Sequence, residues 1–426
     1  MTEFNTAVIG GGFAGLAAAI ASAKCGVKTV LIEKGNCMGG AASNGLVQPF
    51  MKYFTVIDGK QVKLSRGIFE EITTEFLKMY KELDGVDTNS NIVYRFNEEY
   101  LKVIFNRMAQ KYGVTLLYHS YLTDVKKDGE KIKSVELCSR SGKFEIKADY
   151  FIDATGDANL AFLCGYPLRT GRDGDGLCQP MTLNFRVANV DNDVCKQIPH
   201  KEINDLYHKL QNDGTITNPR EDVLMFTNCV DGVIHFNSTR IVKLNPTDPF
   251  DLTKAEITAR EQVMELYTMF KKHIKGFENS RLIMTGSEIG IRESRMIDGE
   301  YILTGEDLKA CKKFDDSIAL GNYDIDIHNP EGSGTSHYLF KDGEYYTIPY
   351  RCLIPKNSKN LLVAGRCISV DHNAQASIRI MPIVCTLGEA AGTAAALAYK
   401  SNCNVNDIDV KLLRSTLKQN GAAVEL

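Results

Sequence analysis

The stretch that decides the fold lies near the start of the sequence and reads Thr6-Ala-Val-Ile-Gly10-Gly-Gly-Phe-Ala-Gly15. Its first five residues form an apolar run typical of a short buried strand, and an alanine-rich helix is predicted from Phe13 to Cys25. A second run, Lys28 to Glu33, predicts another strand. The beginning of the chain therefore indicates one strand-helix-strand unit, which favours an α/β fold with a parallel sheet.

Gly10, Gly12 and Gly15 match the GxGxxG pattern, in which each glycine has a mechanical reason. The first allows a tight turn, the second lets the backbone approach a pyrophosphate, and the third allows close packing of helix on strand. The helix that begins here would point its N-terminal N–H groups at the phosphates. The motif is short, and a glycine-rich turn that binds nothing is the alternative.

An acidic residue favours the ligand-binding interpretation. Glu33 ends the second predicted strand, eighteen residues after Gly15, where a carboxylate can accept hydrogen bonds from ribose hydroxyls. A carboxylate at this place favours a ribose without a phosphate group. We therefore expect FAD or NAD rather than NADP.

The rest of the chain divides into regions of different character. Two amphipathic helices and a β-rich stretch with a hairpin are predicted over 66–83, 98–112 and 114–154. Residues 164–350 then show alternating segments, a long helical pattern and connectors rich in Gly, Pro and Asp. Near Leu353 the α/β character returns, with a strand and a helix predicted over 360–364 and 382–400. The pattern indicates a substrate-facing domain inserted into the first domain.

Three separated blocks resemble one known superfamily. The first block is the N-terminal unit with the small-residue loop Gly39-Gly40-Ala41-Ala42-Ser43, and the second is Asp153-Ala154-Thr155-Gly156-Asp157 at the end of a predicted strand. The third runs from Asn360 through Gly365 and Arg366 to Pro382. Together they are similar to the FAD-dependent oxidoreductases of the glutathione-reductase and fumarate-reductase-like flavoprotein superfamily.

The resemblance implies a fold and a cofactor. The fold would be a Rossmann-like FAD-binding domain of the α/β class, split over 1–163 and 351–426, with an inserted α+β substrate domain over 164–350. The cofactor would be FAD held without a covalent bond, because the loop after Glu33 lacks the histidine that links FAD in the respiratory members. The residues expected to bind FAD are Gly10, Gly12, Phe13, Ala14, Gly15, Glu33, Lys34, Gly40, Ala41, Ala42, Leu122, Ala154, Thr155, Gly156, Asp157, Gly365, Arg366, Ile380 and Met381.

The helix predicted over 382–400 has several features of its own. Pro382 suits the first helical turn, and the free N-terminus of the helix can face the negative charge of a reduced flavin. Gly388 and Gly392 leave one side bare, either for close packing or for contact with the cofactor. The segment is apolar enough to be compared with a membrane span, but Glu389 and the glycines favour a buried helix of a soluble protein.

Arginines are candidates for binding an anion. Arg292 and Arg295 flank Glu293 and either bind a substrate carboxylate or form a salt-bridged corner between domains. Arg379 is expected to clamp an anion or to contact polar atoms of the flavin. Arg240, on a strand predicted from His235 to Arg240, is a weaker candidate for this role.

A histidine is the candidate for proton transfer. His372 is expected in a polar loop before the C-terminal helix, where it would relay a proton near flavin N5 or act as a capping or exposed residue. Arg351 is a further weak candidate at the return to the first domain. The residues expected to take part in catalysis are His372, Arg292, Arg379 and Arg240.

Features that the sequence lacks narrow the chemistry further. No second GxGxxG follows a strand and no CxxC is present, which argues against a disulfide reductase with its own NAD(P)H domain. The twelve cysteines show no metal-ligand spacing, so we expect free thiols in a reducing cytoplasm and no metal site. A net charge of -3 without a basic block argues against nucleic acid and anionic membranes as partners.

These observations lead to a functional hypothesis. The chain is expected to be an FAD-dependent oxidoreductase that transfers a hydride between flavin N5 and a small organic substrate, anionic if the arginines hold it. An unknown electron donor or acceptor would complete the cycle, and the chain could form a homo-oligomer. The alternatives are an FAD-dependent non-redox synthase, a tRNA-modifying flavoprotein or a catalytically silent FAD-binding subunit.

Overall fold

The main sheet joins strands from both ends of the sequence. The computed structural model describes residues 2–88 and 90–426. The seven strands of the sheet are β1 (Thr2–Ile9), β2 (Thr29–Ile32), β5 (Thr115–Leu117), β6 (Tyr121–Asp128), β7 (Lys131–Ser139), β8 (Gly142–Asp153) and β19 (Leu361–Val363). The order β5-β2-β1-β8 is parallel, and β8, β7 and β6 form an antiparallel meander. The predicted α/β class with a parallel sheet is confirmed.

The late strand β19 completes the parallel part of the sheet. It pairs with the end of β8, so that Val363 lies opposite Asp153. On its other side the same end of β8 pairs with β1, which leads into the glycine loop. The C-terminal block therefore reaches the sheet edge from which the N-terminal motif emerges.

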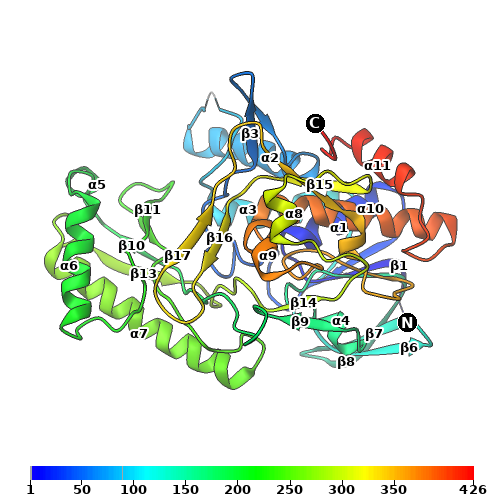
Figure 1. Cartoon of the computed structure of the whole chain (residues 1–426), viewed down its shortest axis with the longest axis horizontal. Helices are drawn as coiled ribbons and strands as arrows, with labels where there is room; N and C mark the ends of the chain where they lie inside the picture. Colours follow the sequence, from blue (N-terminus) through cyan, green and yellow to red (C-terminus); the bar gives the residue numbers. More distant parts are fainter. Residues whose placement is uncertain (1, 89) are drawn as a thin grey trace.

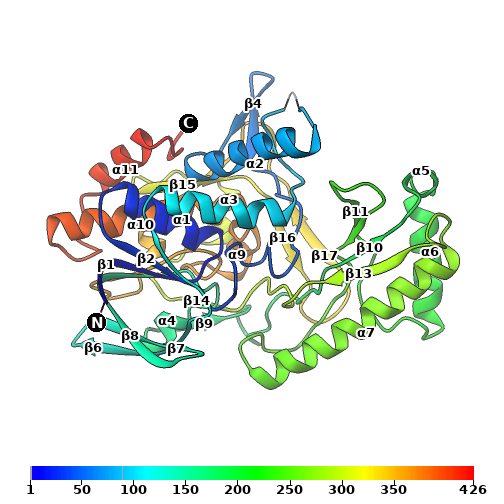
Figure 2. The ribbon, with the colours of Figure 1, turned by 180° about the vertical axis from the view of Figure 1, so that it is seen from behind.

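Two helices from opposite ends of the sequence lie side by side against this sheet. They are α1 (Phe13–Lys24) and α10 (Met381–Ser401), drawn in blue and orange in Figure 1 and seen from behind in Figure 2. The neighbouring helices are α2 (Ile68–Asp84), α3 (Glu98–Lys111) and α11 (Val410–Gln419), and the short helix α4 (Asn159–Leu163) contacts β6 and β8. Both ends of the chain thus contribute to one core.

α1 and α10 pack with their backbones in contact. A Cβ atom on Gly388 would lie 2.0 Å from the carbonyl oxygen of Ala14, and a Cβ atom on Gly392 would lie 2.0 Å from that of Ala18. Any side chain at either position would force the helices apart. The structure therefore gives these glycines the role of close packing, one of the two roles predicted for them.

α10 is a core helix. Among the helices of the described residues it alone is long and apolar enough to span a bilayer, but 94% of its most apolar window is buried inside the protein. Pro382 lies in its first turn, as predicted.

Glu389 is a buried acid on α10. Its Oε2 accepts a hydrogen bond of 3.0 Å from the N–H of Ile68, at the start of α2. The N-cap residue of α2 is Gly67, and a Cβ atom there would lie 2.2 Å from the Glu389 carboxylate. Glu389 thus caps α2 from a distant helix, and burial raises its pKa to about 7.

A second, four-stranded sheet has a core of its own. Its strand order is β11 (Met225–Thr227), β12 (Ile234–Phe236), β10 (Phe185–Ala188), β13 (Arg281–Thr285). The long helix α7 (Pro249–His273) packs on one face, where the rings of Phe185 and Phe236 stack with centroids 4.5 Å apart. Buried residues between 181 and 289 form this core, whereas those from 296 onward join the core of the main sheet. The domain limits at 164 and 350 stay a prediction, and the second core is narrower than that span.

Further helices and strands lie outside the two sheets. They are β3 (Phe54–Ile57), β4 (Lys60–Lys63), β9 (Leu168–Thr170), α5 (Asn192–Cys195), α6 (His200–Asn212), β14 (Arg295–Ile297), α8 (Gly305–Lys309), β15 (Ser317–Gly321), β16 (Ile325–His328), β17 (Thr335–Tyr338), β18 (Tyr346–Pro349), a 3-10 turn (Tyr350–Leu353) and α9 (His372–Ile378). The strands among them form four antiparallel pairs, β3–β4, β9–β14, β15–β18 and β16–β17.

Two local predictions are wrong. The strand predicted from His235 to Arg240 ends at Phe236, because side-chain hydroxyls then replace the ladder: Ser238 donates to the carbonyl of Leu224 at 2.8 Å. His372 begins α9 rather than lying in a loop, because Asp371 caps that helix by accepting the N–H of Ala374 at 2.6 Å.

The helix contact predicts a stability effect. Gly388→Ala should destabilise the fold by about 1–3 kcal/mol, because the new methyl group meets the Ala14 carbonyl. Thermal unfolding followed by circular dichroism measures this loss. Gly332→Ala is the matched control, since a Cβ atom at Gly332 has no atom within 4 Å. An unchanged melting temperature for Gly388→Ala would contradict the close packing of the two helices.

Glu389 predicts a pH effect on stability. Its pKa rises from 4.5 in a free chain to about 7 in the fold, so between these values the folded protein binds more protons than the unfolded chain. The contribution of Glu389 to stability therefore falls as the pH rises through this window. Glu389→Gln keeps an oxygen for the Ile68 N–H but does not titrate. Its free energy of unfolding, relative to that of the wild type, should therefore rise by about 2–3 kcal/mol from the acid end of this window to the neutral end.

Urea unfolding at several pH values measures this difference. Exchange of the exposed Glu82 of α2 for Gln is the control and should follow the wild type. Parallel pH profiles for Glu389→Gln and the wild type would show that the carboxylate is not held as described.

Candidate functional site

The glycine loop forms a cradle in front of α1. Gly10 has a φ of +103°, and a Cβ atom on it would lie 2.4 Å from the carbonyl oxygen of Ala154. A Cβ atom on Gly15 would lie 1.8 Å from the carbonyl oxygen of Gly10. Gly12 differs, because no atom lies within 4 Å of its Cβ position, and no side chain caps the helix that follows it. The start of α1 therefore borders open space at Gly12, and no side chain caps its N–H groups, while Phe13 and Ala14 in the first turn are buried.

Glu33 is fixed beside the cradle. Its carboxylate accepts hydrogen bonds from the N–H groups of Gly11 at 2.6 Å and of Gly35 at 2.7 Å. Ser120 donates its N–H to the carbonyl of Glu33 at 3.1 Å, which brings the start of β6, and with it Leu122, close to this carboxylate. The neighbouring Lys34 points elsewhere and forms a half-exposed ion pair with Glu288 at 3.0 Å.

The loop of small residues lies on the cradle. The N–H of Gly39 donates to the carbonyl of Gly11 at 2.8 Å, and a Cβ atom on Gly40 would lie 3.1 Å from the Cα of Gly12. Ala41 and Ala42 follow directly, and Ala42 is buried. Bulky residues here would close the space in front of Gly12.

The second and third sequence blocks meet at an ion pair. Asp157 accepts hydrogen bonds from Arg366 Nη2 at 2.5 Å and from Ser294 Oγ at 2.6 Å. Burial by itself would raise the pKa of Asp157, but the Arg366 guanidinium and these hydrogen bonds lower it. The guanidinium lies against Gly156, whose Cβ position is 3.0 Å away, while its Nε is buried with no partner among the described residues.

The other predicted residues of these blocks line the same edge of the sheet. Thr155 is held by Asp153, which accepts its hydroxyl at 2.7 Å. Gly365 has a φ of +107° and lies on Ala14, with 3.5 Å between its Cβ position and the Ala14 Cβ. Ile380 and Met381 form the N-terminus of α10, which no side chain caps. The cradle is thus assembled from all three blocks that the sequence singled out.

The second sheet approaches this cradle from the other side. Asn184, next to β10, donates its Nδ2 to the carbonyl of Gly45 at 2.7 Å, and its Oδ1 is buried without a partner in the described part of the chain. His235 on β12 is buried, and neither ring nitrogen has a partner within the described ranges. Burial lowers the pKa of His235 to about 3, so its ring is neutral.

Arg292 is a cation held by neutral oxygen atoms. It donates to the carbonyl of Pro180 at 2.7 Å, to Thr182 Oγ1 at 2.5 Å and to Asn237 Oδ1 at 3.4 Å. Burial, and then the nearby Arg379 guanidinium, lower the pKa of Arg292 well below its usual value. None of the carboxylates in the described residues forms an ion pair with Arg292, and the nearby Asp326 offsets only part of this fall in its pKa.

The Glu293 carboxylate bonds to His372 and not to the flanking Arg292 and Arg295. Its buried carboxylate accepts the Nδ1–H of His372 at 2.9 Å and the N–H of Gln179 at 2.8 Å. Arg295 donates instead to the carbonyl of Asp157 at 2.9 Å. The alternative of a corner in which Glu293 pairs with both flanking arginines is therefore wrong, because the carboxylate points toward α9.

Arg379 lies at the end of α9 beside Asp326. Its Nη2 is 3.6 Å from the Asp326 carboxylate and 3.3 Å from the Asp326 carbonyl oxygen. His328 lies 3.4 Å from the same carboxylate. Burial would raise the pKa of Asp326, but His328 and Arg379 lower it strongly. Arg379 is therefore partly neutralised, and its Nε is buried without a partner among the described residues.

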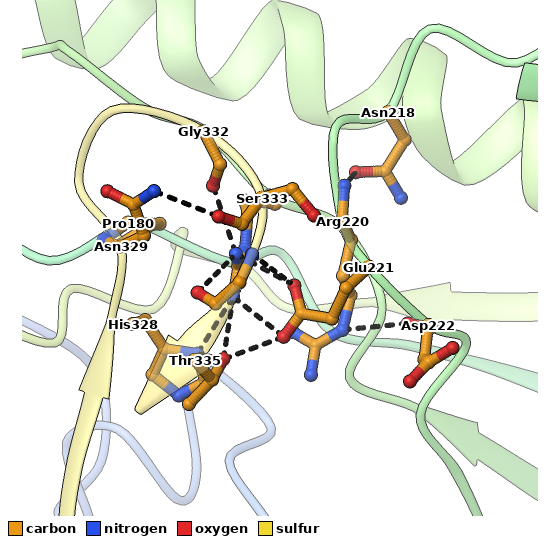
Figure 3. Close-up of polar contacts among 12 residues, drawn as sticks. Pro180, Asn218, Arg220, Glu221, Asp222, His328, Asn329, Gly332, Ser333 and Thr335 are labelled. Carbon is orange, nitrogen blue, oxygen red and sulfur yellow. Dashed lines mark hydrogen bonds and ion pairs between the residues drawn. The ribbon is translucent and has the colours of Figure 1, made fainter. Parts of the chain in front are cut away.

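The contacts of Arg240 do not support the catalytic role predicted for it. Its side chain is 1% exposed and forms an ion pair of 2.8 Å with Glu221. The guanidinium also donates to the carbonyls of Gly332 and Gly334 and approaches Thr335 at 3.3 Å. Figure 3 shows Glu221, Thr335 and Gly332 close to one another. Arg240 holds the loop between β16 and β17, and both terminal nitrogens are used in doing so. Arg351, the weaker candidate, forms a half-exposed ion pair with Asp316.

A pocket of about 630 Å³ opens beside His372. Its walls come from the loop at Arg172, the hairpin β16–β17 and the start of α9. Because Nδ1 of His372 is bonded to Glu293, Nε2 is the nitrogen left for a ligand.

Asn184, Glu293 and Asp326 belong to this region but were not predicted as site residues. They come from separate parts of the inserted segment, and no short motif joins them. The only local signal was at Glu293, which the sequence placed between two arginines.

The sequence matches one protein family over almost its whole length. The sequence model of the family described as FAD dependent oxidoreductase matches residues 6–417. Among solved structures, the chain is similar to a geranylgeranyl bacteriochlorophyll reductase-like protein from Thermoplasma acidophilum, with 14% identity, 98% of this chain and 83% of that chain covered, and a TM-score of 0.48. It is also similar to p-nitrophenol 4-monooxygenase PnpA from Pseudomonas putida DLL-E4, with 11% identity, 99% and 89% coverage and a TM-score of 0.49.

FAD fits the residues of the cradle. The space in front of Gly12 and the uncapped start of α1 suit a pyrophosphate, and the fixed Glu33 carboxylate suits a ribose. The unpartnered Nε of Arg366 and the uncapped N-terminus of α10 lie on the part of the cradle built by the C-terminal block.

A substitution at Gly12 should affect FAD binding without affecting the stability of the fold. Gly12→Ala should leave the melting temperature of the apoprotein unchanged, because its Cβ has free space and its φ of -69° suits any residue. The same methyl group would occupy the cradle and weaken FAD binding by about tenfold or more. Titration of apoprotein with FAD, followed by flavin fluorescence, measures the affinity. Wild-type affinity in Gly12→Ala would show that the pyrophosphate lies elsewhere.

Proposed function

This chain belongs to the family of FAD-dependent oxidoreductases, and from that premise we propose that it transfers a hydride between flavin N5 and a small anionic organic substrate. When bound, FAD supplies the two-electron donor or acceptor at N5. The residues of this chain then have to bind the substrate, orient it and move one proton.

The single observation that carries the proposal is the environment of Arg292. A buried cation is costly unless an anion compensates it, and its partners among the described residues are neutral oxygens. Arg379 adds a second, only partly neutralised guanidinium. A substrate carboxylate would accept hydrogen bonds from Arg292 and reduce this cost.

His372 is the residue we assign to proton transfer. Glu293 accepts its Nδ1–H, which fixes the ring and leaves Nε2 for the pocket that His372 lines. In the oxidative direction Nε2 would take the proton of a substrate hydroxyl or amine as the hydride leaves carbon. In the reductive direction the protonated ring would supply a proton to the substrate.

Gln375 joins the two assigned residues. Its Nε2 donates to the backbone carbonyl of Arg292 at 2.7 Å, and its Oε1 accepts from Gln179, whose N–H is bonded to Glu293. Substrate binding at Arg292 and proton transfer at His372 are thus supported by one hydrogen-bonded layer.

The proposal predicts a redox reaction with an isotope signature. The FAD-loaded protein is mixed without oxygen with a panel of small hydroxy acids and amino acids, and the dithionite-reduced protein with small enoates. One class should change the visible flavin absorbance, and where a hydroxy acid or an amino acid reduces the flavin, deuterium at the C–H that is oxidised should give a primary isotope effect. A neutral amide analogue that reacts as well as the acid would overturn the anionic substrate.

Arg292 provides the matching variant. Arg292→Gln should raise the substrate concentration needed for half-maximal flavin reduction by about 10–100-fold, because a charge-assisted hydrogen bond is lost. Arg351→Gln is the control, since Arg351 is paired with Asp316 at the surface. Equal behaviour of the two variants would contradict the assigned role of Arg292.

A further inference from the structure

The outer face of α7 carries an apolar line with a seven-residue repeat. Phe250, Ile257 and Met264 are 84%, 60% and 48% exposed, and we call these three residues the α7 stripe. The opposite side of the helix is buried, with Ala259, Val263 and Leu266 among the residues that face the second sheet. α7 is therefore apolar on the side that faces its own core and also along one narrow line that faces solvent.

The position of α7 leaves this line accessible. In Figures 1 and 2 the helix runs along the outer edge of the second sheet, away from α1 and α10. Isolated exposed apolar residues are normal on protein surfaces, but these three recur every seven residues and so form one line along a 25-residue helix.

Charges beside the α7 stripe indicate what would pair with it. Lys254 and Glu261 are both exposed, and neither forms an ion pair within the described residues. They are seven positions apart and therefore lie on the same side of the stripe. A twofold axis perpendicular to the helix at Ile257 would bring Lys254 of one copy opposite Glu261 of the other, and the reverse.

The same axis also matches the apolar residues. It would set Ile257 against Ile257 of the second copy, and Phe250 against Met264. One helix surface thus matches itself in its apolar residues and in its charges, as a twofold interface requires.

We propose that the α7 stripe is a self-association surface on which a second copy of this chain docks its own α7 in the antiparallel direction. A single helix-to-helix contact buries little surface, so the dimer forms in a concentration-dependent manner. The surface lies on the far side of the second sheet from the FAD cradle, and the inference does not depend on the substrate.

Sedimentation velocity of the FAD-loaded protein over a range of concentrations tests the proposal. The mass should rise from 47.3 kDa toward twice this value as the concentration increases. Ile257→Glu should keep the protein at the monomer mass, because it sets two carboxylates against each other on the twofold axis. Thr258→Glu is the control, since Thr258 is exposed but turned away from the stripe.

Charge exchange tests the partner and its direction. Lys254→Glu should raise the dissociation constant of the dimer by about tenfold, because two attractive pairs become repulsive. The double variant Lys254→Glu with Glu261→Lys should restore wild-type association. A protein that stays monomeric at all concentrations, a dimer unaffected by Ile257→Glu, or no rescue by the double variant would each overturn the proposal.

Discussion

The contact between α1 and α10 is the constraint on which the rest of the structure depends. At Gly388 and Gly392 the helices touch through a bare backbone and two carbonyl oxygens, which fixes their separation. α1 begins at the glycine loop, and α10 begins next to the Arg366 block, so the same contact fixes the distance between the two halves of the cradle. Hydrophobic burial holds the helices together, but the small residues decide how closely they approach.

Arg240 and Arg292 differ in whether a carboxylate neutralises their charge. Arg240 is surrounded by Glu221 and by carbonyl oxygens, so its charge is neutralised and its position serves a loop. Arg292 also donates several hydrogen bonds, but their acceptors are neutral oxygen atoms. Its sequence neighbour Glu293, which would neutralise it most simply, faces His372 instead. The fold therefore keeps Arg292 without an ion-pair partner among the described residues, one position before the carboxylate that orients the His372 ring.

The sequence was sufficient for the cradle and for the α/β class. The glycine loop, Glu33 and the late strand and helix are recognisable because backbone conformation and packing restrict which residues can stand there. The roles of individual polar residues could not be predicted as well from the sequence. Arg240 and Arg292 look alike in sequence, and only tertiary contacts distinguish a neutralised arginine from one without a counter-ion. His372 was placed in a loop because a capping Asp followed by a seven-residue helix gives a weak periodic signal.

The split cradle has a consequence for how the protein is made. The glycine loop leaves the ribosome well before its partner α10, which begins at Met381. At synthesis rates of about 5–20 residues per second, the nascent chain carries half a cradle for roughly tens of seconds. During this time α1 exposes the alanine face that α10 will cover, and no complete pocket exists to retain a flavin. FAD can therefore bind only late in synthesis. Until then, α10 cannot protect the alanine face of α1 from aggregation.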